Sequence, residues 1–174
     1  MGRKPGIGAL LLLVLGAWLL IQGCAGSSDN GDGESLGAGE SVRAHVVRVV
    51  DGDTIVASVD GQDQYVRYIG VDTPESVKPQ TPVQCFAERA SAFNARLVEG
   101  RTVRLEQDVE ARDRYGRLLA YVRAGGLFVN AELVRRGYAR PLTVPPNVRY
   151  ADRFSRLASQ ARAAGTGLWS ACSS

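Results

Sequence analysis

The sequence predicts an α+β domain, in which a small closed barrel of five strands carries about three α-helices packed against it. Three strand-like runs, separated only by short turns, open the domain and indicate a meander. A helical segment then separates this meander from two further strand-like runs, and helical periodicity returns after the last of them. This order of elements is typical of the OB-fold, whose five strands close into a barrel.

Two N-terminal segments are set apart from that domain. Residues 1–23 begin with Arg3 and Lys4, continue into an apolar run and end in small residues, which is the layout of a secretory signal. The apolar run is shorter than the roughly 20 residues that a membrane-spanning helix requires. Residues 24–40 are Gly, Ser and acidic residues with almost nothing to bury, which predicts a flexible tether. The domain therefore covers residues 41–174, a size suited to one ordinary domain.

The segment "LIQGC" at the end of the signal resembles the lipobox of bacterial lipoproteins, whose cysteine becomes the lipidated first residue after cleavage. This resemblance predicts an exported protein that lipid on Cys24 holds at a membrane of the cell envelope. Gln22 is an unusual residue within such a box. The alternative is a plain secretion signal cut a few residues later, which would give a secreted protein.

The other two cysteines, Cys85 and Cys172, are left as a pair in an oxidising compartment. We therefore expect a disulfide that ties the C-terminal tail to the body of the domain. Two unpaired thiols are the alternative.

The domain is modestly basic. Residues 41–174 hold 19 basic and 14 acidic residues. A surplus of this size fits a polyanionic partner such as nucleic acid, although the same surplus also serves solubility.

The meander begins with a β-branched run at residues 42–50 and continues at 54–59, where apolar residues alternate. The turn-forming residues "DGQD" at 60–63 precede a return strand at 64–71. We expect a hairpin centred near residue 62.

That register predicts a pair of carboxylates at one edge of the sheet. Asp53 would lie opposite residue 71 and therefore beside Asp72. Two carboxylates that meet in this way repel each other unless a cation or a proton intervenes. Asp51, which precedes this pair, is interpreted as a residue that shapes the turn or supports the site.

The remaining elements follow from helical and strand periodicity. A helix at 85–100 would place Phe86, Ala90, Phe93 and Leu97 on its apolar face. The next elements are expected as strands at 101–107 and 117–124, a short helix at 130–137 with Asn130 as its N-cap, and a last helix at 149–165. Trp169 is expected to pack the C-terminal segment.

Five separated motifs together resemble the staphylococcal-type nuclease (thermonuclease) family. They are "VVDGDT", "YVRYIGVDTPE", "RDRYGRLLAYV", "VNAELVRRGYA" and "GLWS", in this order and at about the right separations. The resemblance covers residues 42–170. Any one of these motifs alone would be weak, whereas the agreement of all five is specific.

The resemblance implies a calcium site. Asp53 and Asp72 match the two calcium-binding carboxylates of the family, and Thr73 matches the residue whose backbone carbonyl joins them. Ca²⁺ is a hard cation that takes six to eight oxygen ligands, waters included, so two carboxylates, a carbonyl and solvent make an adequate open site.

The resemblance also implies the catalytic residues. Glu75 matches the general base that activates water, Arg67 and Arg117 match two arginines on the scissile phosphate, and Arg114 and Tyr115 match contacts to another phosphate. Guanidiniums donate paired hydrogen bonds to phosphate oxygens and stabilise the charge that develops in the transition state. The incoming phosphate and the carboxylates would explain Arg67 within an apolar strand. A purely structural Arg–carboxylate pair is the alternative.

These matches predict an exported, Ca²⁺-dependent endonuclease that acts as a monomer on DNA and RNA and leaves 3′-phosphate ends. The alternative is a non-catalytic OB-fold domain that only binds nucleic acid. One departure from the family lies at "ARPLTVPPN", 139–147, where the family has a pair of tyrosines around the terminal base and this chain has none. Because each base stacked on an aromatic ring contributes about 1–3 kcal/mol, affinity or base preference is expected to differ.

Overall fold

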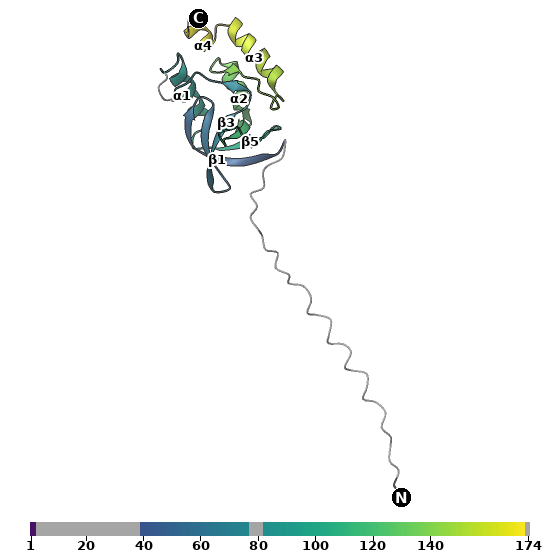
Figure 1. The fold of residues 1–174 in the computed structure, drawn as a ribbon. Coiled ribbons are helices and arrows are strands. Elements are labelled where there is room, and N and C mark those ends of the chain that lie inside the picture. The colour runs from purple at the N-terminus through teal and green to yellow at the C-terminus, as the bar shows by residue number, and fades with distance from the viewer. Residues whose placement is uncertain (3–38, 77–81, 173–174) are drawn as a thin grey trace. The chain divides into compact units, whose positions relative to one another are not determined.

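The computed structural model describes residues 1–2, 39–76 and 82–172 (Figure 1). The chain divides into two units, Met1–Glu34 and Ser35–Ser174, and the second contains all of the helices and strands described below. The predicted signal, the lipidation site Cys24 and most of the predicted tether lie outside the described residues. Among the residues described, no helix combines the length and apolar character needed to cross a membrane.

The predicted meander is present, but the register of its second hairpin differs from the prediction. Strands β1 (Ser41–Asp51), β2 (Thr54–Val59) and β3 (Gln62–Tyr68) pair antiparallel, and Val59 lies opposite Gln62. Only Asp60 and Gly61 form the turn, with φ of 50° and 79°. Such a turn with two positive φ values matches the strand twist, and Asp-Gly is among its preferred sequences.

The prediction that Asp53 lies opposite residue 71 was therefore wrong. Thr54 pairs with Arg67, and the N–H of Tyr68 donates to the carbonyl of Asp53 at 2.9 Å. The tight turn shifts the register by three positions and carries Arg67, instead of the Asp72 region, to the level of Asp53.

The predicted return strand also ends early. At Gly70, where φ is 79°, the chain bends, and a Cβ there would lie 2.5 Å from the ring of Phe154. Strand β4 (Val71–Asp72) then pairs with β8 (Arg140–Pro141) in a separate two-stranded sheet. Because only glycine fits this bend, it is glycine that allows Asp72 to return towards Asp53.

The barrel closes through strands β5 (Thr102–Glu106) and β6 (Leu118–Ala124). The sheet order is β3-β2-β1-β5-β6-β7, with β7 at Leu127–Phe128, and an additional parallel pairing of β3 with β6 closes the five long strands on themselves. The α+β class and the five-stranded OB-fold predicted from the sequence are confirmed. Completely buried side chains fill the barrel, among them Val46, Ile55, Val66, Leu105 and Val122.

In the described part of the chain, four helices accompany the barrel (Figure 1): α1 (Ala87–Val98), α2 (Val129–Arg135), α3 (Ala151–Ala163) and the short α4 (Leu168–Ala171). The fourth explains the difference from the three that the sequence predicts. Trp169 belongs to α4, and the guanidiniums of Arg140 and Arg162 lie 5.4 and 5.5 Å from its ring.

Asn130 has a different role from the predicted N-cap. It lies inside α2 and is completely buried. Its side-chain amide donates to the carbonyl of Ile69 at 2.9 Å, and its side-chain oxygen accepts from the N–H of Val122 at 2.8 Å. Both the amide and the oxygen of the Asn130 side chain are hydrogen-bonded to backbone groups, one just after β3 and one in β6. The side chain therefore does not cap the helix.

Helix α1 buries a face one position away from the predicted one. Ala90 is buried as expected, but the other buried residues are Ala87, Asn94 and Val98. Phe93 lies at the edge of that face and stacks on Tyr138, with ring centroids 4.1 Å apart.

Candidate functional site

The β1–β2 turn holds Asp53 in a fixed, nearly buried position. Its side-chain oxygens accept from the N–H of Thr73 at 2.7 Å and from the hydroxyl of Thr54 at 3.3 Å. Asp51 accepts from the N–H of Asp53 at 3.0 Å, which is the turn-shaping interaction expected of it. Burial raises the pKa of the Asp51 carboxyl, although the positive charge of Arg67 opposes that rise.

Gly52 makes this arrangement possible. A Cβ at this position would lie 2.7 Å from the hydroxyl oxygen of Thr73. Thr73 can therefore pack directly on the turn and direct its N–H to Asp53. Because Gly52 in "DGDT" has no side chain, Thr73 can contact the turn that carries Asp53, although the two residues are 20 positions apart in the sequence.

Arg67 joins the two carboxylates that the sequence singled out. Its guanidinium forms an ion pair with Asp53 and donates to Asp72 at 3.0 Å. The side chain of Asp53 is 3% exposed, that of Arg67 17% and that of Asp72 57%, so the cluster runs from the interior to the surface. Burial lowers the pKa of the Arg67 guanidinium, and the charge of Asp72 opposes this shift.

The oxygen atoms in this cluster suit a hard cation. Asp53 and Asp72 supply carboxylate oxygens on either side of one guanidinium, and Asp72 is open to solvent. Within the described part of the chain, no three His, Cys, Asp or Glu side chains gather closely enough to hold a metal ion on their own. A cation here would complete its coordination with backbone oxygen and water, as Ca²⁺ tolerates.

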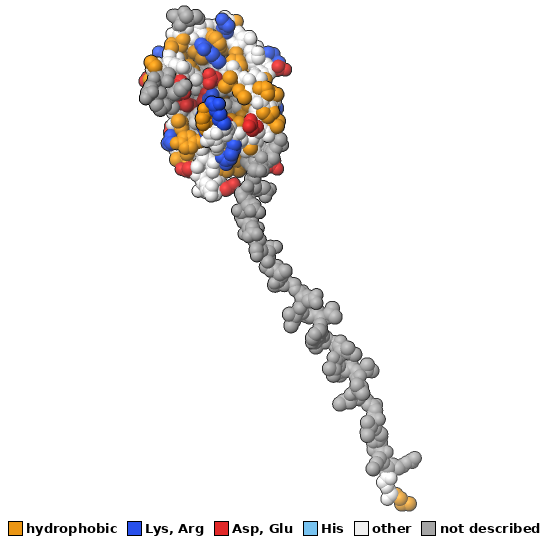
Figure 2. Space-filling model, in the orientation of Figure 1, with side chains coloured by type: hydrophobic (Ala, Val, Ile, Leu, Met, Phe, Trp, Pro, Cys, Tyr) orange, Lys and Arg blue, Asp and Glu red, His pale blue; other side chains and the backbone are white. Residues whose placement is uncertain are grey.

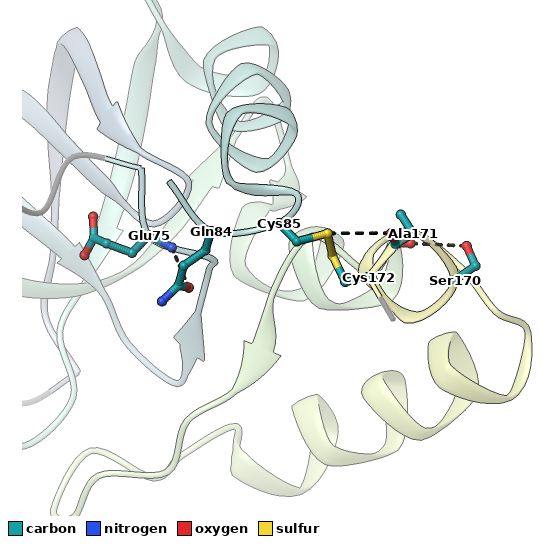
Figure 3. Close-up of a disulfide and its surroundings, with 7 residues drawn as sticks. Glu75, Gln84, Cys85, Ser170, Ala171 and Cys172 are labelled. Carbon is teal, nitrogen blue, oxygen red and sulfur yellow. Dashed lines mark hydrogen bonds between the residues drawn. A yellow bond between two sulfur atoms is a disulfide. The ribbon is translucent and has the colours of Figure 1, made fainter. Parts of the chain in front are cut away.

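Glu75 follows this cluster at the mouth of a loop that Gln84 closes. The N–H of Glu75 donates to the side-chain oxygen of Gln84 at 2.9 Å, and the N–H of Gln84 donates back to the carbonyl of Glu75 at 3.0 Å. Figure 3 shows the Glu75 carboxylate directed away from Gln84 and from the neighbouring disulfide. Two hydrogen bonds thus fix the backbone of Glu75, and residues 77–81 of the loop are outside the described residues.

Arg117 is held by a residue that the sequence analysis missed. Asp113 accepts from the side chain of Arg117 at 2.8 and 2.7 Å, and from the backbone N–H groups of Arg117 at 3.0 Å and Tyr115 at 2.9 Å. The spacing "DRYGR" contained a signal for this role, because an Asp side chain commonly accepts from backbone groups two residues on. The charge of Arg117 contributes to lowering the pKa of Arg67, so the two guanidiniums lie within electrostatic range.

Arg114 and Tyr115 extend the same loop into solvent. The Tyr115 side chain is among the exposed large apolar groups, at 68%, and the guanidiniums of Arg114 and Arg117 lie 4.8 and 5.6 Å from its ring centroid. Arg114 also donates to the Tyr115 hydroxyl at 2.6 Å. The loop therefore presents two guanidiniums close to one exposed aromatic ring.

Cys85 and Cys172 form a disulfide with 5.8 Å between their Cα atoms, next to Gln84 (Figure 3). A small pocket of about 160 Å³ lies against it, lined by Asp72, Thr73, Gln84 and Arg140 among others. The disulfide is thus adjacent to the residue that holds Glu75, and it ties the tail after α4 to the start of α1.

The surface around these elements mixes charges of both signs. On the face shown in Figure 2, basic and acidic side chains lie close together among apolar ones. In the loop where the family has its tyrosine pair, the side chains of Leu142 and Val144 are instead 41% and 55% exposed, and the Pro145–Pro146 peptide bond is cis.

The chain resembles known nucleases over most of its length. Residues 65–171 match the family described as staphylococcal nuclease homologue. The thermonuclease of Staphylococcus intermedius is 41% identical over 170 residues, which cover 96% of this chain and 98% of that protein. The thermonuclease of Staphylococcus hyicus is 46% identical over 125 residues, 72% and 74% of the two chains. Endonuclease YncB of Bacillus subtilis (strain 168) is 42% identical over 125 residues, 71% and 59%.

Proposed function

The chain belongs to the staphylococcal nuclease homologue family, and on that premise we propose that it is a calcium-dependent endonuclease that hydrolyses DNA and RNA with little sequence preference. We further propose that it acts as a monomer and leaves 3′-phosphate ends. The observation that carries this proposal is the Asp53–Arg67–Asp72 cluster, in which two carboxylates and a guanidinium meet at a partly open edge of the barrel.

Asp53 and Asp72, with the backbone carbonyl of Thr73, would hold Ca²⁺. When bound, the cation neutralises charge on the phosphodiester and stabilises the negative charge that develops at phosphorus. The chemistry of the ligand atoms supports this calcium site, because carboxylate oxygens are the ligands that a hard cation prefers. The hydrogen bonds from Thr73 and Thr54 preorient the Asp53 oxygens for this task.

Arg67 and Arg117 would bind the non-bridging oxygens of the scissile phosphate. A planar guanidinium donates two parallel hydrogen bonds, and each bond gains strength as charge accumulates on those oxygens. The positive charges of Arg67 and Arg117 are close enough to repel each other. An anionic ligand bound by both guanidiniums would reduce this repulsion, which supports a shared phosphate. Arg114 and Tyr115 would contact a neighbouring phosphate.

Glu75 would act as the general base. A water oxygen attacks phosphorus while its proton passes to the Glu75 carboxylate, and the bond from phosphorus to the 5′ oxygen breaks. The released 5′ oxygen takes up a proton, so the products are a 3′-phosphate and a 5′-hydroxyl. General base catalysis of this kind contributes about 10²- to 10⁴-fold to the rate.

Digestion of plasmid DNA and of RNA, with calcium or with chelator, tests this proposal. Internal cleavage of both polymers that requires calcium, with end-group analysis that finds 3′-phosphates, is the expected result. Salt-dependent binding of both polymers without any cleavage would instead identify a non-catalytic binding domain, and the nuclease proposal would then be rejected.

We also propose that the protein is exported and is held at a membrane of the cell envelope by lipid on Cys24. The support is the sequence layout of residues 1–23 and the "LIQGC" segment. A Cys24→Ser variant should be released from the membrane fraction and should lose metabolic labelling with a fatty acid. A variant that stays membrane-bound would defeat the lipid anchor.

A further inference from the structure

Three arginines stand side by side on neighbouring strands of the barrel. Arg43 of β1 pairs with Arg104 of β5, and Arg104 pairs in turn with Arg123 of β6. Their sequence neighbours Ala44, Val103 and others are buried in the barrel, so the three side chains face outwards. Because neighbouring strands lie about 4.8 Å apart, the arginine row of Arg43, Arg104 and Arg123 spans roughly 10 Å.

Among the residues that the structure describes, the arginine row is only partly neutralised. Glu106 accepts from Arg104 at 2.7 Å and from Arg123 at 2.8 Å, which sets one carboxylate against three guanidiniums. A fourth guanidinium is close, because Arg123 and Arg153 both lie over the ring of Phe128, at 4.4 and 5.2 Å. Like charges directly opposite each other on paired strands destabilise a sheet. The protein therefore carries a repulsion here that a bound anion would relieve.

A shallow groove runs along the arginine row. It has a volume of about 500 Å³ and is lined by the three arginines, Thr102 and the turn of Gly125 and Gly126. A Cβ at either glycine would meet no atom within 4 Å, so this turn leaves open space beside Arg123. The groove is thus accessible to an extended ligand.

The groove is separate from the candidate site. Arg67 pairs with Leu119 of β6, and Arg123 is four residues further along that strand. At about 3.3 Å per residue, the two positions are roughly 13 Å apart. Between them, Tyr121 is buried and packs against Tyr150 at 4.7 Å. The arginine row therefore does not belong to the pocket around Asp53 and Asp72.

We propose that the arginine row is a second binding site for the phosphodiester backbone of a nucleic acid strand. This inference rests on the proposed function, because it assigns the groove to the same polymer that is cut at the other site. Arginine forks bind phosphates without reading sequence. A polymer held at one of two sites also presents a high effective concentration to the second. The row thus increases affinity for long strands and leaves the chemistry unchanged.

A double substitution, called the row variant below, tests the contribution of the arginine row to binding. Arg43→Gln with Arg104→Gln removes two charges and keeps the pair of Arg123 with Glu106. The matched control, Arg96→Gln with Arg156→Gln, removes two exposed arginines of α1 and α3 and the same net charge. Full-length proteins are compared in chelator, so that binding is measured without cleavage, and melting curves verify that each variant is folded.

Fluorescence anisotropy then measures two ligands. One is a single-stranded DNA of about 40 nucleotides, longer than the roughly 4–16 nucleotides that one OB-fold covers, and the other is a trinucleotide. For the long strand, the row variant should bind about tenfold more weakly at low salt, and the slope of log K against log salt should fall by about 1.4 for two lost contacts. Trinucleotide binding should not change, and the control variant should resemble the wild type.

Each other outcome has a definite meaning. Equal long-strand affinity and salt slope in the row variant and the control would overturn the inference. The inference would also be overturned if the row variant lost binding to phosphatidylserine-containing vesicles but bound DNA as the wild type does. That result would assign the arginine row to a membrane surface. Cleavage of DNA by the wild type is measured separately, with calcium. If the row variant binds DNA more weakly but the wild type does not cleave DNA, the second binding site is supported and the proposed nuclease activity is rejected.

Discussion

Asp113 determines where the guanidinium of Arg117 lies. It receives two hydrogen bonds from that side chain and two from the backbone of the same loop. If Arg117 binds the scissile phosphate, its orientation matters because misplacing a catalytic group by about 1 Å can cost roughly 10²-fold in rate. Asp113→Asn should therefore lower kcat by about tenfold or more, with a much smaller change in KM. Asp113→Glu should recover part of the rate, and steady-state kinetics with both variants would contradict the positioning role if kcat did not change.

The same carboxylate has a defined effect on acid stability. Burial alone would raise the pKa of Asp113, but hydrogen bonds from Arg117 and Tyr115 outweigh it and hold the pKa below its usual value. A carboxyl whose pKa is lower in the folded state stabilises the fold above its unfolded pKa of about 3.9, and this stabilisation is lost as pH falls through the folded pKa. Urea titrations below pH 4 should show a shallower loss of stability in Asp113→Asn than in the wild type. Parallel curves would exclude this contribution.

Glu75→Gln separates binding from catalysis. The amide keeps the size of the side chain and the backbone hydrogen bonds to Gln84, but it cannot accept a proton from water. Turnover should fall by about 10²- to 10⁴-fold while nucleotide and calcium affinity stay within a few fold. Single-turnover cleavage and equilibrium binding of a nucleotide measure the two quantities. Unchanged turnover would remove Glu75 from the mechanism.

Residue types were more predictable from the sequence than residue contacts. The "VDGDT" and "VDTPE" motifs identified Asp53 and Asp72, and the structure joins both to Arg67. The roles of Asp113 and Gln84 were not predicted, because both side chains accept hydrogen bonds from backbone N–H groups. Which N–H groups lie within reach depends on the conformation of the loops. Asn130 shows the same limit, since a buried amide that serves two strands looks like a helix cap in the sequence.

At the scale of elements, most boundaries were predictable, although the predicted return strand at 64–71 ends at Tyr68, and the register was not predictable. Strand β2 has the predicted ends and α3 begins and ends within two residues of its predicted span, because periodicity and stop signals act locally. The β2–β3 register depends on which residues adopt positive φ in "DGQD", and this turn uses only Asp60 and Gly61. The bend at Gly70 depends on the ring of Phe154, a contact 84 positions away in the chain.

The disulfide joins two elements that border the candidate site. It closes a separation of 87 residues between the start of α1 and the end of α4, and Gln84 precedes Cys85 directly. Cys85→Ser with Cys172→Ser should lower the unfolding free energy by about 2–4 kcal/mol, because the unfolded chain regains freedom. Activity should also fall, since Gln84 loses the support of its neighbour and holds Glu75 less firmly. Thermal melts and cleavage assays would test both effects.

Gln84→Ala is the matched variant for that experiment. It removes the side-chain acceptor of the Glu75 N–H and leaves the disulfide in place. Activity should fall while the melting temperature stays close to that of the wild type. If the Gln84 variant were fully active, the loss of activity in the cysteine variant would have to come from the fold and not from Glu75.

For the whole molecule, barrel closure and the site are parts of one arrangement. Arg67 lies on the strand whose parallel pairing with β6 closes the barrel, and its neighbours across the two pairings are Thr54 and Leu119. The turn before β2 supplies Asp53, and the bend after β3 supplies Asp72. The charge cluster therefore lies where the barrel closes. Among the described residues, Arg67 is the only arginine whose guanidinium contacts Asp53.

If calcium binds Asp53 and Asp72 as proposed, the stability of the whole protein should depend on this cation once Arg67 is removed. In Arg67→Met the nearly buried carboxylate of Asp53 loses its partner, and breaking such a pair costs about 3–5 kcal/mol, or roughly 10 °C in Tm. Calcium that binds Asp53 and Asp72 should restore much of this loss, so the calcium-dependent rise in Tm should be larger in Arg67→Met than in the wild type. Arg117→Met is the control, because its partner Asp113 is near the surface, and its calcium response should match the wild type. Calorimetry in calcium and in chelator measures these shifts without any substrate. An equal calcium response in Arg67→Met and the wild type would show that the guanidinium and the cation do not share the Asp53 carboxylate.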